Sequence, residues 1–145
     1  MTPPPPPILA PLPLAGDGTY RLDKIHAGRP ERQAVLLEIA GRKHQGGVDI
    51  SVDVDLVREP TNQYDPRAVR VEIGGQLVGY LSREHARDVA LTLALNGDRQ
   101  RATCKARIVG GWKRQPTPTR EGSEGDFGVR LDVVMPPRMA AEVAE

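Results

Sequence analysis

The residues of this chain that could do chemistry concentrate in a polar loop within residues 56–71, where Tyr64 is followed directly by Asp65. A tyrosine ring offers a flat face to a ligand, and a carboxylate accepts hydrogen bonds from hydroxyl donors. Pro60 and Pro66 fix their own backbone torsions and restrict the residues before them, which stiffens the loop. Because a stiff loop loses little conformational entropy when a ligand binds, we expect a binding site here.

Carboxylates near this loop raise a second possibility, metal-dependent hydrolysis of a phosphodiester. Asp53, Asp55, Glu59 and Asp65 lie close in sequence, and two of them could bind a divalent ion. Asp53 and Asp55 fall on the outward face of an expected strand, however, whereas the other two lie in the loop beyond it. This spacing gives the four no reason to converge. A metal-dependent nuclease is therefore the weakest alternative, and we predict no catalytic residue and no metal ligand.

Cofactor chemistry has no other support in the sequence. The histidines have no metal-ligand spacing with the single cysteine, Cys104, and no glycine-rich phosphate loop is followed by lysine and serine or threonine. One cysteine excludes an intrachain disulfide and indicates a reducing compartment. We therefore predict a cytoplasmic protein without cofactors.

The polar loop is positioned by segments in which apolar and polar residues alternate, as in strands with one buried face. The expected strands cover residues 33–41, 48–57, 69–73, 77–81, 102–108 and 127–135. Gly74-Gly75 is a hairpin signal between two of them. Ser82 is a good N-cap for a helix through Asn96, with Gly97 as its stop. The pattern predicts a mainly β fold with one main helix, arranged as a bent antiparallel sheet or partly open barrel.

The length of 145 residues fits one modest domain. We expect a proline-rich tail and linker at 1–31, the folded domain at 32–135 and a short tail at 136–145. Residues 2–14 read as a polyproline II spacer that cannot pack a core, or as a ligand for an aromatic-lined groove. Residues 112–126 read as a long mobile loop.

The net charge of +1 excludes a basic field over the whole surface. Any contact with nucleic acid must therefore be local. No apolar stretch is long enough to cross a bilayer, and we expect a monomer that does not associate with membranes.

The polar loop and the hairpin after it carry a pattern of fixed residue types at fixed intervals. The pattern reads Arg58-Glu59-Pro60-x-Asn62-x-Tyr64-Asp65-x-x-Ala68-Val69-x-Val71, then Gly75-x-x-Val78-Gly79-Tyr80-Leu81 and a helix. It resembles the HIRAN domain, and the likeness covers roughly residues 35–134. The resemblance implies a small OB-like, partly open β-barrel that captures 3′ ends of single-stranded DNA.

By position, the resemblance assigns the DNA contacts to seven residues: Arg42, Lys43, Tyr64, Asp65, Tyr80, Arg83 and Phe127. Tyr64 and Asp65 would meet the terminal 3′-hydroxyl. Lys43 departs from the family pattern, which has a base-stacking aromatic there. Trp112 is a rival to Phe127 for packing on the terminal base.

The residue types agree with this assignment. A carboxylate such as Asp65 can accept a hydrogen bond from a terminal hydroxyl and would repel a terminal phosphate. Aromatic rings stack on any base, and arginines contact phosphates. Structural roles remain open for the same residues: Asp65 could cap its loop, Tyr80 and Phe127 could be core, and Glu59 and Asn62 could hold the loop internally.

Together these observations predict a non-enzymatic module for single-stranded DNA with a free 3′-hydroxyl end. It would serve a helicase or nuclease partner in DNA repair, associated with the nucleoid when bound. The alternative from another class is a protein-interaction adaptor that keeps the fold without a working DNA pocket. Exposed aromatics facing Asp65 would favour DNA, and buried aromatics would favour the adaptor.

Overall fold

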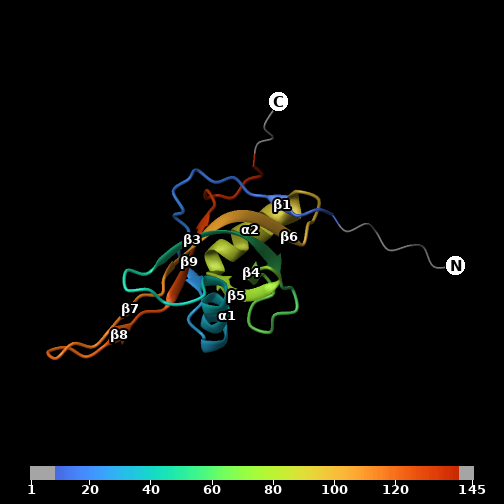
Figure 1. Cartoon of the computed structure of the whole chain (residues 1–145). Helices are drawn as coiled ribbons and strands as arrows, with labels where there is room; N and C mark the ends of the chain where they lie inside the picture. The colour runs from blue at the N-terminus through green and yellow to red at the C-terminus, as the bar shows by residue number, and fades with distance from the viewer. Residues whose placement is uncertain (1–8, 141–145) are drawn as a thin grey trace.

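A computed structural model describes residues 9–140, so the proline run at 3–7 lies outside the described residues. Within this range the chain forms nine strands and two helices (Figure 1). Seven of the strands belong to one mixed sheet, and the other two form a separate ribbon. The prediction of a mainly β fold is confirmed.

Two long strands form the centre of the sheet. β3 (Val48–Arg58) and β6 (Arg101–Gly110) pair antiparallel over almost their whole length. β3 continues through the polar loop into β4 (Val69–Ile73), which turns at Gly74-Gly75 into β5 (Gln76–Leu81). Both glycines have positive φ, which explains why this turn needs them. The predicted strands here, and their antiparallel pairing, are confirmed.

The edges of the sheet are built from segments far apart in sequence. β9 (Phe127–Asp132) pairs antiparallel with β6, and β1 (Leu12–Pro13) pairs parallel with the start of β6. β2 (Ile25–His26) pairs with β5 at the opposite edge. A single bridge between Leu22 and Leu131 spans the gap from β9 towards β2. The sheet therefore curves back on itself without closing, and the β1 pair makes it mixed rather than wholly antiparallel.

The predicted helix is α2 (Arg83–Leu95), capped by Ser82, whose hydroxyl accepts a hydrogen bond from the His85 amide. Its apolar stripe is buried against the sheet through Ala86, Val89, Ala90 and Leu93. In Figure 1 α2 lies between the curved strands, where it fills the concave side of the sheet. No helix of the described residues is long and apolar enough to span a membrane.

The strand expected at 33–41 is wrong: this segment is the helix α1 (Pro30–Ala40). Val35 with Ile39 and Leu36 with Ala40 are pairs four residues apart, so they share one helical face, which packs on the core. Leu37 points out and is 41% exposed. Pro30 at the first helical position and Glu31 in the first turn are helix-start signals. The segment resembled a strand because its short apolar run fits both the two-residue period of a strand and the 3.6-residue period of a helix.

The prediction that residues 2–14 form a spacer without core contacts is wrong for the C-terminal residues of this segment. Leu12 and Leu14 are buried in the main core. The amide of Ala140 donates to the Pro13 carbonyl, so chain beyond residue 135 is attached as well. The folded unit thus begins before residue 32, because β1 pairs with the start of β6, which β9 does not reach.

Residues 112–126 are not a structureless loop. β7 (Lys113–Arg114) and β8 (Ser123–Glu124) pair antiparallel and form a ribbon that projects from the body of the domain (Figure 1). The amide of Gly125 donates to the Trp112 carbonyl at 3.0 Å at the base of this ribbon.

Candidate nucleic-acid interface

The polar loop is held in one shape by its own backbone and by Asn62. The Glu59 amide donates to the Ala68 carbonyl at 2.9 Å, which closes the loop at its base. The Asn62 side-chain oxygen accepts from the amides of Tyr64 and Asp65 at 2.8 and 3.0 Å. The expected role of Asn62 in holding the loop is confirmed, and the side chains of Tyr64 and Asp65 are aimed by this turn.

Glu59 anchors the loop to the hairpin behind it. Its carboxylate accepts hydrogen bonds from the Tyr80 hydroxyl at 3.0 Å, Asn62 Nδ2 at 2.8 Å and Arg70 at 3.2 Å. Burial raises the pKa of Glu59, but the hydrogen bonds from Asn62, Tyr80 and Arg70 outweigh it, so the pKa lies below its usual value. Burial and the bond to Glu59 raise the pKa of Tyr80. Glu59 is therefore charged and structural.

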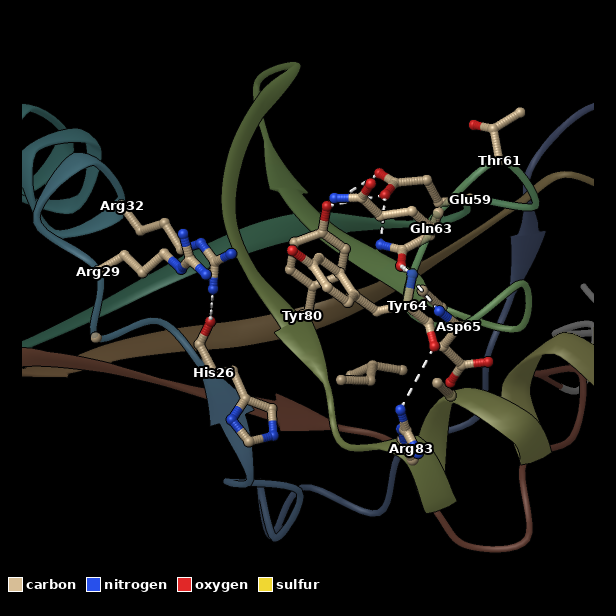
Figure 2. Close-up of a pocket in the computed structure, with 15 residues that line it drawn as sticks. His26, Arg29, Arg32, Glu59, Thr61, Gln63, Tyr64, Asp65, Tyr80 and Arg83 are labelled. Carbon is tan, nitrogen blue, oxygen red and sulfur yellow. Dashed lines mark hydrogen bonds between the residues drawn. The ribbon is translucent and has the colours of Figure 1, made fainter.

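A pocket opens between this loop and the first turns of both helices (Figure 2). Its cavity volume is about 870 Å³. The loop supplies Tyr64 and Asp65, the start of α1 supplies Arg29 and Arg32, and the start of α2 supplies Arg83. We call it the helix-end pocket. The N-terminal end of a helix carries partial positive charge, so both helices favour an anion at this place.

The two loop residues at the rim of this pocket, Tyr64 and Asp65, differ in their exposure to solvent. The Tyr64 side chain is 77% exposed, although a large aromatic ring normally gains stability from burial. Asp65 is half-buried, and its Oδ1 accepts a hydrogen bond from the Arg67 amide at 2.9 Å. Its Oδ2 accepts no hydrogen bond from any described residue. Asp65 therefore caps its turn and still offers one carboxylate oxygen to a ligand.

The basic side chains of the pocket are held by carbonyl groups and an aromatic ring. Arg32 donates to the His26 carbonyl at 2.6 Å, and its guanidinium lies over the Tyr80 ring, 4.9 Å from the centroid. Arg83 donates to the Tyr64 carbonyl at 3.4 Å (Figure 2). Within residues 9–140 neither arginine forms an ion pair. The pocket thus places three arginines and an exposed aromatic ring around the carboxylates of Glu59 and Asp65, which also line it.

The model of the HIRAN domain family matches residues 33–116, more than half of the chain. This chain belongs to the HIRAN domain family. HIRAN domains are DNA-binding modules and are generally non-catalytic. Comparison with curated proteins and with solved structures gave no match.

The family match places most of the pocket inside the HIRAN domain and part of it outside. The polar loop, Tyr80 and Arg83 fall within the matched residues, whereas His26, Arg29 and Arg32 precede them. The sequence analysis missed these three residues because it treated residues 1–31 as tail and linker and expected a strand at 33–41. Pro30 was the available signal, since a proline at a helix start would have placed Arg29 and Arg32 on the first turn.

Not all the residues assigned from sequence come together in this HIRAN domain. Tyr64, Asp65, Tyr80 and Arg83 line the helix-end pocket. The other three, Arg42, Lys43 and Phe127, do not line it; Arg42 and Lys43 follow the C-terminal end of α1, which begins at the pocket.

Phe127 is only 3% exposed, so its ring belongs to the hydrophobic core, and it lies beyond the residues that the family model matches. Lys43 lies over the ring at 5.9 Å and forms an ion pair with Glu124 at 3.4 Å. Trp112 is half-buried beside the ribbon, with the Arg114 guanidinium 5.1 Å from its ring centroid. Neither aromatic lines the helix-end pocket, so Tyr64 is the large exposed aromatic that this pocket offers.

The carboxylates considered for metal binding are dispersed. Asp53 pairs with Lys105 at 2.9 Å on the outer face of β3, while Glu59 faces Tyr80 and Arg70. Among residues 9–140, no group of three or more histidine, cysteine, aspartate or glutamate side chains is placed to hold a metal ion. Burial raises the pKa of the Cys104 thiol to about 12, so it is protonated at neutral pH.

Proposed function

We propose that this HIRAN protein binds single-stranded DNA by taking a free 3′-hydroxyl end into the helix-end pocket. The observation that carries the proposal is the exposed Tyr64 ring beside the free Asp65 oxygen, opposite arginines at the starts of two helices. These groups match the three parts of a strand end: a base, a hydroxyl and phosphates.

Each group has a physical task in this proposal. Tyr64 stacks on a base, an interaction that tolerates any sequence. Asp65 accepts a hydrogen bond from the terminal hydroxyl and repels a terminal phosphate, because two negative charges would meet at short range. Arg29, Arg32 and Arg83 attract the internucleotide phosphates, assisted by the helix dipoles.

The protein acts in this proposal as a recognition module, not as an enzyme. It delivers a helicase or nuclease of DNA repair to strand ends in the cytoplasm, at the nucleoid. The exposed Tyr64 ring beside Asp65 supports this DNA role over the adaptor role, for which buried aromatics were expected.

The test is fluorescence anisotropy with a short 5′-labelled DNA strand that ends in either a 3′-hydroxyl or a 3′-phosphate. Wild type should bind the hydroxyl end more tightly, and the preference should disappear in Asp65→Ala. Asp65→Asn is the matched variant, because its side-chain oxygen can still accept from the Arg67 amide. It should keep the fold but bind the two ends more equally, since the repulsion of phosphate is gone.

Equal binding of both ends by wild type would limit the proposal to end-independent DNA binding. Absence of binding to either strand at low salt would reject it and favour the adaptor. An RNA strand of the same sequence and 3′-hydroxyl end shows whether the pocket requires deoxyribose.

A further inference from the structure

A second hollow, with a volume of about 600 Å³, adjoins the helix-end pocket. Tyr64, Asp65 and Arg83 line both, so these residues form a shared wall between them. Arg67 from the polar loop and Arg87 from α2 line only the second hollow. A strand whose end occupies the first hollow can therefore continue past Tyr64 into the second.

The arginines of the second hollow are exposed and weakly compensated. Within the described residues Arg67 and Arg83 form no ion pair, and Arg87 approaches Asp88 at 3.7 Å in an exposed pair of little strength. Glu84 also lines the hollow, but three guanidinium groups outnumber its carboxylate and that of Asp65. The hollow therefore favours an anion.

The positions of two of these arginines are unfavourable for the helix itself. Arg83 is the first residue of α2, where the helix dipole disfavours a cation. Arg87 follows four residues later on the same face, so the two like charges repel one another. An anion between them would turn both costs into favourable contacts.

We propose that Arg67 and Arg87, with Arg83, hold the phosphates 5′ to the captured end, so that the bound strand leaves the helix-end pocket past Tyr64 along the start of α2. This inference rests on the proposed function and adds the direction of the strand. A competing route exists at the ribbon, where Lys43, Lys113, Arg114 and Arg120 line another hollow. That hollow shares no residue with the helix-end pocket.

The test compares a DNA trinucleotide with a decanucleotide, both ending in a 3′-hydroxyl and labelled at the 5′ end, by anisotropy across a salt series. Wild type should bind the decanucleotide more tightly. In Arg67→Ala/Arg87→Ala the gain with length, which is the affinity for the decanucleotide divided by that for the trinucleotide, should fall about tenfold. The slope of log affinity against log salt should become shallower by about 1.4, because each phosphate that is no longer neutralised accounts for about 0.7. Arg67→Lys/Arg87→Lys should restore most of the gain, which a purely structural defect would not predict.

Lys113→Ala/Arg114→Ala is the matched control, because it removes the same charge from the ribbon. It should leave the gain with length in place. If this control loses the gain and the Arg67/Arg87 variant keeps it, the strand follows the ribbon and the inference is wrong. If wild type binds both lengths equally, end capture stands and the inference is wrong. If wild type binds neither length, both the end-capture proposal and this inference are rejected.

Discussion

The hydroxyl of Tyr80 donates to the carboxylate of Glu59, with both oxygens 3.0 Å away. This contact joins the hairpin strand β5 to the first residue of the polar loop. Tyr80 therefore has a structural task besides any contact with DNA, and the position of Tyr64 and Asp65 depends on it through the loop. The site and the fold share one hydrogen-bond network.

Removal of the Tyr80 hydroxyl should destabilise the fold. In Tyr80→Phe the Glu59 carboxylate loses a donor, and a hydrogen bond to a charged group is worth about 1.5–3 kcal/mol. Urea denaturation should show a lower midpoint with an unchanged slope. The double variant Tyr80→Phe/Glu59→Gln should lose less unfolding free energy than the two single variants lose together. Strict additivity would contradict the coupling of the two residues.

Glu59 should make stability depend on pH at the acid side. Its pKa in the folded state lies below the ordinary value of 4.5, so its contribution is fully present above pH 4.5 and is lost as pH falls through the folded-state pKa. The difference in unfolding free energy between wild type and Glu59→Gln should shrink on acidification through this range. Urea denaturation over a pH series measures it, and parallel curves for the two proteins would contradict the expectation.

Substitution of Tyr64 should separate binding from stability. Because the side chain is 77% exposed, Tyr64→Ala should change the free energy of unfolding by no more than about 0.5 kcal/mol. The loss of a stacked base should weaken DNA binding by about 1–3 kcal/mol. Tyr64→Phe is the control that keeps the ring. Anisotropy titration and thermal denaturation of both variants check the prediction, which fails if Tyr64→Ala binds DNA as wild type does.

Phe127 should behave as a core residue. Its ring is 3% exposed, and replacement of a buried phenylalanine by alanine costs about 3–5 kcal/mol. Phe127→Leu keeps most of the apolar volume, so it should remain folded and retain DNA affinity. Denaturation and anisotropy distinguish the outcomes. A stable Phe127→Leu variant that binds DNA much more weakly would indicate that Phe127 contacts DNA.

The segment around Leu12 should prove to be part of the domain. Leu12 is fully buried, so Leu12→Ala should cost about 2–5 kcal/mol of stability. Leu9→Ala is the matched control, because Leu9 is 46% exposed and should matter little. Thermal denaturation of the two variants decides whether the chain before residue 15 supports the fold, and equal melting temperatures would contradict the burial of Leu12.

Several features could be read from the sequence because their signals are local. β3 alternates along its own length, Gly74-Gly75 requires a turn, and Ser82 caps the helix that follows it. The loop of Tyr64 and Asp65 was found the same way, because prolines and an asparagine fix its shape from within. Neighbouring residues determine most of the conformation of these elements, and in the loop the Tyr80 hydroxyl adds an anchor from β5.

Tertiary structure alone decided the remainder. The apolar run of α1 fits a strand or a helix; Pro30 marks a helix start, and packing on β5 and β9 selects the face that is buried. That choice brings Arg29 and Arg32 to the pocket. Phe127 is buried where Gln33 of α1 bonds its backbone and Lys43 lies over its ring, whereas Tyr64 remains 77% exposed. Burial and charge at a site depend on residues far apart in sequence. The sequence therefore shows the residue types, but only the tertiary structure shows which of them come together in one pocket.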